Sequence, residues 1–180
     1  MGGQRCPRIA RGARAVPGAC LVSARPHAPL SRDEIAGLTG LEVLQRVLRG
    51  ELPGPPIAAT MQLDLVHVEA GLVVFEGQPS ESFLNPLGSV HGGWIATLLD
   101  SAMACAVHSQ LGPGQGYTTV EMKVSFVRAV SATTPRVRCE GRVIHLGGRL
   151  AVAEGRITDD AGRLVAHGTE TCLVFDPRGG

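Results

Sequence analysis

The sequence predicts an α+β domain in which a curled antiparallel β-sheet wraps around one long central helix. The first indication is an apolar, helix-like segment from Gly92 to about Leu111 that carries a single formally charged side chain, Asp100. The second is the series of segments after it, in which apolar and polar residues alternate with the period of two that is typical of strands. A single apolar helix followed by such strands buries its surface only if one sheet curls around it.

Composition limits the class of protein. The chain has 180 residues, 44% of them hydrophobic and 18% charged, with a net charge of +1, which fits one globular domain. The near-neutral balance gives no reason to expect nucleic acid as a partner, and the apolar segment around Asp100 is too short to span a membrane. The five cysteines are an odd number without a C-x-x-C pair. We therefore expect no disulfide framework and no metal, and a reducing, cytoplasmic compartment.

Residues 1–32 differ from the rest of the chain and are predicted to form an Arg-rich, disordered leader. They contain six arginines, and the first acidic residue is Asp33. An organelle transit peptide has a similar composition, but prolines interrupt this segment and it shows no amphipathic helix. Such a segment buries too little apolar surface to order itself, so it is expected to be dispensable. The folded domain is predicted to cover residues 33–176.

The segment after the leader carries a helix signal and then two strand signals. Ser31 and Glu34 have the spacing of a capping box, and apolar residues from Leu38 to Leu48 recur at helical spacing. The prolines of "PGPP" end this helix. Strand-like segments at 60–69 and 71–79 follow, joined by a tight Ala-Gly turn, and a loop then leads to the central helix.

The segments after the central helix predict four antiparallel strands linked by short turns. The first strand, "YTTVEMKVSFV", is expected to place its apolar residues on one face together with Thr118, and Thr119 with its charged residues on the other. Three further strands are predicted at 136–146, 149–158 and 163–175. The glycine-containing turns between these three strands indicate hairpins.

Asp100 is the residue that this helix pattern does not explain. It lies seven residues after Gly93, too deep in the helix to cap it, and its neighbours three and four residues away carry no positive charge. A buried carboxylate without a partner is costly, and such groups persist mostly where chemistry needs them. We therefore interpret Asp100 as a catalytic base or nucleophile.

The sequence "HGG" in front of the helix supplies a complementary feature. A helix N-terminus presents unpaired N–H groups, and glycines there let a substrate carbonyl approach the backbone. Hydrogen-bond donors aimed at a developing oxyanion contribute strongly to acyl transfer. Gly92 followed by Asp100 eight residues later thus predicts an oxyanion hole and a base or nucleophile, with a water or acyl carbon between them.

Two segments, "NPLGSVHGGWIATLLDSAMACAV" and "YTTVEMKVSFVRAV", resemble the hot-dog-fold acyl-CoA thioesterases of the phenylacetate-degradation (PaaI) type. The later "GRVIHLGGRLAVAEGRITDDAGRLVAHGTETCLV" is similar to the closing strands of these enzymes. The resemblance implies the hot-dog fold and hydrolysis of an aryl-, phenylacetyl- or medium-chain acyl-CoA thioester to the free acid and CoA, without a cofactor. It also implies a homodimer, paired again into a homotetramer, with subunits joined at their sheet edges and active sites at each dimer interface.

The resemblance assigns roles to individual residues. Asp100 matches the catalytic carboxylate, and Gly92 matches the oxyanion donor. Thr119 matches a residue that orients the water and comes from the partner subunit, with Thr118 one position away. The other predicted site residues are His91 and Asn85 around the thioester carbonyl, and Gly93, Trp94, Met122, Arg128 and Arg149 as substrate contacts, with the two arginines near the CoA phosphates.

Two alternative functions stay open at this level. Hot-dog enoyl-CoA hydratases resemble a pattern with His five residues after the Asp, a position that Cys105 occupies here. Acyl-CoA-sensing hot-dog proteins carry a separate DNA-binding segment, and residues 1–32 are too rich in Pro and Gly to form one. A hot-dog protein that binds acyl-CoA without turning it over is compatible with the sequence.

Overall fold

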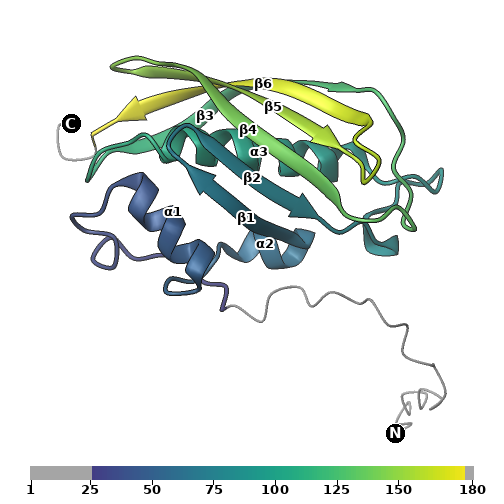
Figure 1. Cartoon of the computed structure of the whole chain (residues 1–180), viewed down its shortest axis with the longest axis horizontal. Helices are drawn as coiled ribbons and strands as arrows, with labels where there is room; N and C mark the ends of the chain where they lie inside the picture. The colour runs from purple at the N-terminus through teal and green to yellow at the C-terminus, as the bar shows by residue number, and fades with distance from the viewer. Residues whose placement is uncertain (1–25, 177–180) are drawn as a thin grey trace, which may run out of the picture.

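A computed structural model of the protein describes residues 26–176; most of the predicted leader, residues 1–25, lies outside the described residues, as do residues 177–180. Six strands form one antiparallel sheet that wraps around the long helix α3 (Figure 1). This arrangement is the hot-dog fold that the sequence predicted. The elements are α1 (Gly40–Arg49), α2 (Pro56–Met61), β1 (Leu63–Glu69), β2 (Leu72–Gly77), a short 3-10 helix η1 (Glu81–Phe83), α3 (Gly92–His108), β3 (Gly116–Phe126), β4 (Val137–Leu146), β5 (Leu150–Thr158) and β6 (Leu164–Phe175).

The core lies between α3 and the inner face of the sheet. Leu98, Leu99 and Met103 of α3 are fully buried. Gly141 of β4 lies so close to the helix backbone that a Cβ at this position would collide with the carbonyl of Ala102. The sheet therefore packs directly on α3 and fixes its position. None of the helices among residues 26–176 is long and apolar enough to cross a membrane.

The order of the strands differs from the expected series of short turns. The sheet runs β1-β2-β4-β5-β6-β3, so β3 forms one edge beside β6, whereas β4 lies between β2 and β5. Residues 127–136 connect β3 to β4, while β4, β5 and β6 follow one another through the predicted hairpins. The expected short link between β3 and β4 was wrong. A sequence pattern indicates which face of a strand is apolar, but the closure of the sheet around α3 decides which strands pair.

A β-bulge in β3 changes which of its side chains face α3. Thr119 and Glu121 pair with consecutive residues of β6, so Val120 is an extra residue between them. Thr118 and Val120 are exposed, whereas Thr119 is partly buried and Met122 packs against the core. The expected single alternation is therefore wrong for the first half of the strand, since the bulge shifts the period by one residue.

The first helix begins later than the sequence predicted. Ser31 and Glu34 do exchange the two hydrogen bonds of a capping box, at 2.7 and 3.3 Å. The chain then forms turns, and Gly37 adopts a positive φ of 79°. Helix α1 starts only after a second capping box, formed by Thr39 and Glu42. Likewise, residues 56–61 form α2, so the strand expected from residue 60 begins at residue 63.

Residues 26–30 lie inside the predicted leader and yet contact the folded domain. His27 forms a β-bridge with Gly54, and the Ala28 N–H donates to the Gly54 carbonyl at 3.0 Å. The Gly54 N–H in turn donates to the Pro26 carbonyl at 3.0 Å. The expected boundary at residue 32 therefore falls within a segment that docks on the domain, because these bonds use backbone atoms, whose partners composition does not reveal.

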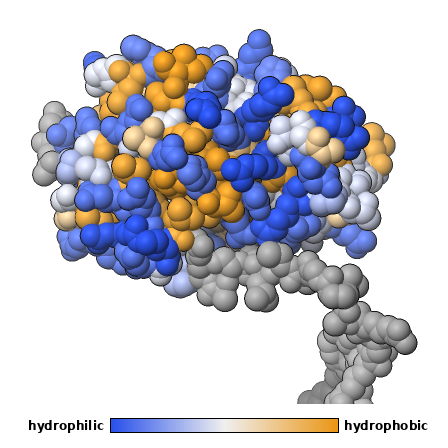
Figure 2. Space-filling view, in the orientation of Figure 1, coloured by the Kyte–Doolittle hydropathy of each residue, from blue (hydrophilic) through white to orange (hydrophobic). Residues whose placement is uncertain are grey.

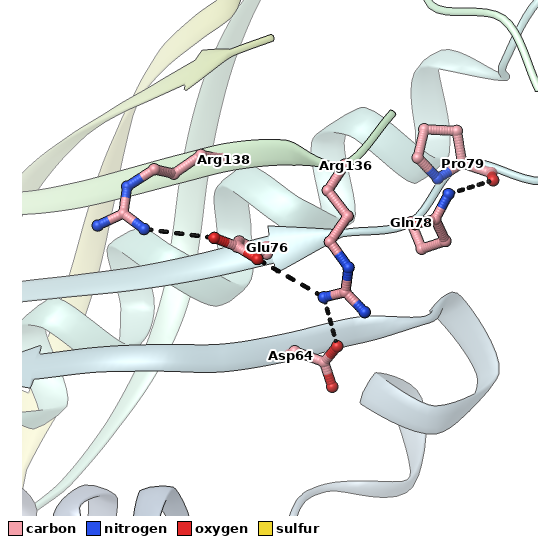
Figure 3. A network of polar contacts seen from close by, with 6 residues as sticks. All are labelled: Asp64, Glu76, Gln78, Pro79, Arg136 and Arg138. Carbon is pink, nitrogen blue, oxygen red and sulfur yellow. Dashed lines mark hydrogen bonds and ion pairs between the residues drawn. The ribbon is translucent and has the colours of Figure 1, made fainter. Parts of the chain in front are cut away.

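Ion pairs tie the edge strand β1 to its neighbours on the face of the sheet opposite α3 (Figure 3). Arg136, just before β4, places Nη1 2.8 Å from Oδ2 of Asp64 and 3.6 Å from Oε2 of Glu76. Arg138 of β4 approaches the same Glu76 at 3.5 Å. The network thus joins β1, β2 and the start of β4.

Candidate active site

Asp100 lies in the middle of α3 and meets β3. Its Oδ1 is 3.2 Å from Oγ1 of Thr119, which the bulge turns toward the helix. Asp100 itself is only partly buried. The structure therefore brings Asp100 and Thr119 together in one chain. This corrects two expectations, namely a buried carboxylate without a partner and a threonine supplied by the partner subunit.

A second carboxylate, which the sequence analysis missed, lies on the other side of Thr119. Glu170 of β6 is 1% exposed, and its Oε1 accepts hydrogen bonds from the Thr119 hydroxyl at 2.6 Å and from Cys172 Sγ at 3.1 Å. The signal for it was present in the sequence. Glu170 is the acidic member of an otherwise apolar, inward-facing row of alternate residues, Ala166, Gly168, Cys172 and Val174.

Burial governs the protonation of the groups around Asp100. It raises the pKa of Glu170, although the hydrogen bonds from Thr119 and Cys172 act in the opposite direction, and the charge of Asp100 raises it further. Burial also raises the pKa of Cys105 and of Cys172 to about 12. At neutral pH these thiols are uncharged, so any negative charge in the cluster resides on the two carboxylates. Within residues 26–176, no three His, Cys, Asp or Glu side chains gather so that they could hold a metal ion.

The N-terminus of α3 forms the other half of the candidate site. His91 is the N-cap residue, and its Nδ1 accepts the N–H of Gly93 at 2.8 Å. The proton of a neutral ring therefore resides on Nε2, where it can be donated to a ligand. The cap occupies the N–H of Gly93, whereas the N–H of Gly92 bonds to no residue in the described part of the chain. Gly92 is thus the backbone donor that remains for a substrate, while the predicted contact through Gly93 loses its donor.

Gly92 also has a tight environment that favours glycine. A Cβ at this position would lie 3.1 Å from Cζ of Phe126, whose ring is itself largely exposed. A larger side chain at position 92 would therefore have to displace the ring. It would also cover the backbone N–H that a substrate carbonyl must approach.

Asn85 shapes the turn that leads to α3. Its Oδ1 accepts the backbone N–H groups of Leu87 at 2.9 Å and Ser89 at 3.2 Å, and its Nδ2 donates to Ser89 Oγ at 2.8 Å. The N–H of His91 donates to the carbonyl of Phe83 at 2.7 Å. These bonds fix the entry of the chain into the helix. The predicted contact of Asn85 with a thioester carbonyl stays a prediction.

The two halves of the site do not meet within one chain. Gly92 and Asp100 are eight residues apart in the same helix, which corresponds to a rise of about 12 Å. A carbonyl group that accepts a hydrogen bond from Gly92 is therefore out of reach of the Asp100 of the same chain. The expectation that a water or acyl carbon lies between them in one subunit was wrong.

Trp94 belongs to the core and does not form a wall of the candidate site. It is 2% exposed, its Nε1 donates to the carbonyl of Met61 at 2.8 Å, and its ring stacks on Phe83 at 5.8 Å. The side chain thereby connects α3 to α2 and η1. Its predicted substrate contact is wrong for this chain.

The other predicted substrate contacts are dispersed. Met122 is partly buried on the inner side of β3. Arg128 is exposed two residues after the end of β3. Arg149 is exposed before β5, and its carbonyl accepts the N–H of Val174, the partner of Tyr117 near the start of β3. The two arginines thus lie near opposite ends of β3 and do not converge on one phosphate site in a single chain.

An apolar cavity of about 250 Å³ lies beside the candidate site, between α1, β1, the segment from His27 to Leu30, and the C-terminal half of α3. Its lining includes Cys105, which follows Asp100 by five residues on α3, and Tyr117, which precedes Thr119 by two residues on β3. The ring of His108, tilted against Tyr117 at 5.2 Å, also lines the cavity, and burial lowers its pKa. The cavity therefore shares the elements α3 and β3 with the Asp100–Thr119 pair, although neither of these two residues lines it.

Comparison with known proteins identifies the class to which this fold and site belong. The profile of the thioesterase superfamily matches residues 87–166, which include α3 and β3. The human protein acyl-coenzyme A thioesterase 13 is 30% identical over 113 residues, which cover 61% of this chain and 78% of that protein. A phenylacetic acid degradation-related protein from Ralstonia eutropha has a solved structure with 32% identity and a TM-score of 0.66, covering 72% of this chain and 98% of that one. The PaaI protein of Escherichia coli, 20% identical with a TM-score of 0.67 over 76% of this chain and 96% of its own, shares the fold.

The chain therefore belongs to the thioesterase superfamily and to its PaaI-type hot-dog enzymes. It is a thioester hydrolase, and the resemblance to this family that the sequence indicated is confirmed.

Proposed function

We propose that the protein hydrolyses acyl-CoA thioesters at a site shared between two copies of the chain. In this site, the Gly92 N–H of one copy binds the thioester carbonyl, and Asp100 of the other copy supplies the base or nucleophile. The observation that carries the proposal is the separation of about 12 Å between these residues on one helix. The name of the human relative, which specifies acyl-coenzyme A, supports the choice of thioester.

The chemistry follows from the groups on each side. As a base, Asp100 takes a proton from a water that attacks the carbonyl carbon, and the Thr119 hydroxyl orients that carboxylate. The Gly92 N–H and the Nε2–H of His91 stabilise the developing oxyanion. The C–S bond then breaks, and CoA leaves as a thiolate that takes up a proton. A single turnover in heavy-oxygen water separates this route from nucleophilic attack by Asp100, which would put an unlabelled carboxylate oxygen into the first acid product.

The edge strand β3 is the surface on which the second copy would pair. No other strand among residues 26–176 covers its outer edge, and Val120, Phe126 and Val127, in or just after it, are exposed by more than half. Pairing of two β3 strands would extend the sheet across both copies and remove both open edges. It would also set the two α3 helices side by side, as a shared site requires.

A second apolar surface supports the pairing of dimers into a tetramer. Figure 2 shows apolar side chains gathered over the β4–β5 hairpin at the upper left of the molecule. Ile144, Leu146 and Leu150 there are 56%, 38% and 50% exposed. Exposed apolar patches of this kind commonly mark protein interfaces.

The volume of the cavity near the candidate site bears on the size of the acyl group that the protein accepts. A volume of about 250 Å³ lies just below the range of about 300–1,000 Å³ that is usual for pockets of drug-sized ligands. This size favours aryl, phenylacetyl and medium-chain acyl groups over long chains. Val47→Phe, on the cavity lining, should lower kcat/KM for octanoyl-CoA more than for acetyl-CoA. Ala161→Phe, in the exposed turn between β5 and β6, serves as the matched control and should leave the ratio unchanged.

Replacing Asp100 tests the chemistry. Asp100→Asn keeps the size of the side chain but removes the base and the nucleophile, so single-turnover hydrolysis should fall by roughly a hundredfold or more. Binding of acyl-CoA should change little, because the acyl and pantetheine contacts remain. Hydrolysis at the parental rate by this variant would exclude the assignment.

A heterodimer tests the shared site. Asp100→Asn and Gly92→Val chains, each with its own affinity tag, are co-expressed and the mixed dimers are purified through both tags. If the residues act across subunits, one of the two sites combines both changes and the other has neither, so about half of the parental activity should return. If both residues act within one chain, each site carries one defect and the mixed dimer stays inactive.

The alternative functions receive less support. The position that a hydratase would use for a second acid–base residue holds Cys105, whose thiol stays protonated at neutral pH because burial raises its pKa to about 12. The family assignment as a hydrolase leaves a non-catalytic sensor without support. The thiols of Cys105, Cys139 and Cys172 are unpaired, which agrees with the proposed cytoplasmic location.

A further inference from the structure

Thr119 contacts two carboxylates at once, and its hydroxyl has one proton to give. Its Oγ1 lies 2.6 Å from Oε1 of Glu170 and 3.2 Å from Oδ1 of Asp100. If both carboxylates were ionised, the Thr119 oxygen would turn a lone pair toward one of them, which is unfavourable. Both contacts are favourable when one carboxyl group is protonated and donates to Thr119.

The surroundings favour Glu170 as the protonated group. It is 1% exposed, and its Oε2 is buried without a hydrogen-bond partner among residues 26–176. Asp100, in contrast, is only partly buried. An ionised carboxylate with an unpaired buried oxygen is costly, whereas a protonated carboxyl group is less so. Burial accordingly raises the pKa of Glu170.

Among residues 26–176, the elements packed around Glu170 supply no positive charge to it. Helix α3 presents Asp100 and Cys105 to the cluster, and β3 presents Tyr117 and Thr119. Strand β6 itself adds Cys172, and the residue opposite Glu170 on β5 is Ala153. Burial raises the pKa of the Tyr117 phenol as well. Ionisation of Glu170 would therefore place a second negative charge next to Asp100 without a cation to balance it.

We propose that Glu170 is a positioning residue that acts through Thr119 on Asp100. The protonated carboxyl group of Glu170 donates to the Thr119 oxygen, and Thr119 then donates its own proton to the ionised Asp100. When Glu170 loses its proton, the Thr119 hydroxyl rotates so that it donates to Glu170 instead of Asp100. Asp100 is then left without this hydrogen bond. Turnover therefore decreases as Glu170 ionises on the alkaline side. This inference rests on the proposed role of Asp100 in hydrolysis.

The test compares the dependence of kcat on pH in two variants. Glu170→Gln keeps an N–H donor toward Thr119 at every pH, whereas Glu170→Met fills the same space without a donor. We expect the alkaline decrease in kcat to be absent in Glu170→Gln. Glu170→Met should lower kcat by roughly ten- to a hundredfold with little change in KM, because a misoriented base slows the chemical step. Glu170→Gln should restore most of this loss relative to Glu170→Met.

A second substitution separates positioning from general structural support. In a Thr119→Val background the connection between the carboxylates is absent, so changing Glu170 to Gln or Met should have no further effect on kcat. An alkaline decrease that persists in Glu170→Gln, or full effects of Glu170 substitutions in Thr119→Val, would overturn the proposal. Should Glu170→Met fail to fold, the pH profile of Glu170→Gln still decides the question. The Asp100→Asn variant tests the proposed role of Asp100 separately. If this variant hydrolyses thioesters at the parental rate, Asp100 does not perform the chemistry, and this result does not depend on Glu170.

Discussion

The two edges of the sheet differ in how they are covered. At one edge, β1 packs against α1 and α2, and Arg136 and Arg138 tie it to β2 and β4 through Asp64 and Glu76. At the other edge, β3 pairs with β6 and with no further strand in the described part of the chain, and its Val120 is exposed. The covered edge closes the fold of one chain, whereas the open edge is available to a second one.

The two edges of the sheet also contribute different parts of the candidate site. Near the covered edge, the segment from His27 to Leu30 and helix α1 form one wall of the apolar cavity. The open strand β3 supplies Thr119 to Asp100, and its last residue, Phe126, lies over Gly92. One edge therefore shapes where an acyl group can lie, and the other edge carries the residues near the proposed chemistry.

The largest effect is expected from a charge on the open edge. Val120→Glu would place like charges against each other where two β3 strands pair, so the protein should become monomeric and lose turnover by roughly a hundredfold. Ile144→Glu is the matched control, since Ile144 is likewise the extra residue of a bulge and is likewise 56% exposed. Because Ile144 lies on the proposed surface between dimers, this control should lose the tetramer but keep the β3-paired dimer and its activity. Light scattering and hydrolysis rates are measured on the same samples, and a fully active Val120→Glu monomer would contradict the comparison.

A moderate effect is expected from weakening the covered edge. Arg136→Leu removes the partner of two partly buried carboxylates, and should lower the free energy of unfolding by about 1–3 kcal/mol. Turnover at low temperature should hardly change, because the ion pairs of Arg136 involve none of the residues assigned to the chemistry. Arg142→Leu, which removes an exposed ion pair with Glu140, should cost less than about 0.5 kcal/mol. Equal losses in urea unfolding for both variants would show that the edge network has no special role.

A smaller effect is expected from shortening the N-terminus. A chain that starts at Pro26 should unfold like the full-length protein, whereas a chain that starts at Asp33 loses the hydrogen bonds to Gly54 and one wall of the cavity. We expect a loss of about 1 kcal/mol and a relaxed preference for acyl length. If both chains behave alike in melting and in their preference among acyl-CoA substrates, the docked segment is dispensable, as the sequence alone suggested.

The smallest expected effect concerns Glu170, the β6 residue that contacts Thr119 of β3, and the dependence of stability on pH. Because burial raises the pKa of Glu170 in the folded state, the native protein holds this proton more tightly than the unfolded chain. The stability from this proton is fully present below the unfolded pKa and is lost as pH rises through the folded pKa. Glu170→Gln lacks this ionisation. The melting temperature of the variant minus that of the parent should therefore increase as pH rises from the unfolded to the folded pKa of Glu170. A constant difference between the two melting temperatures would contradict the direction of the shift.

Several elements were predictable from local pattern alone. The apolar segment from Gly92 formed the central helix, and the hairpins among the last three strands appeared at the predicted turns. Asp100 stood out because charge is rare in such a helix.

Other features depended on contacts between distant segments. The bulge at Val120 turned Thr119 inward, and periodicity cannot show an extra residue because it assumes a regular strand. Glu170 was overlooked although it follows the same rule as Asp100, a lone acid in an apolar row. Trp94 was assigned to the substrate and lies in the core, since its nearness to Gly92 in sequence does not fix the direction of its side chain.

The sequence by itself determined the family, the central helix and the carboxylate in its middle, because each of these is encoded in residues adjacent along the chain. The tertiary structure alone decided that β3 lies at an edge of the sheet formed by residues 26–176, and that Thr119 joins Asp100 to Glu170. The physical reason is that strand order and bulges set distances between residues far apart in the sequence, and periodicity carries no information about such distances.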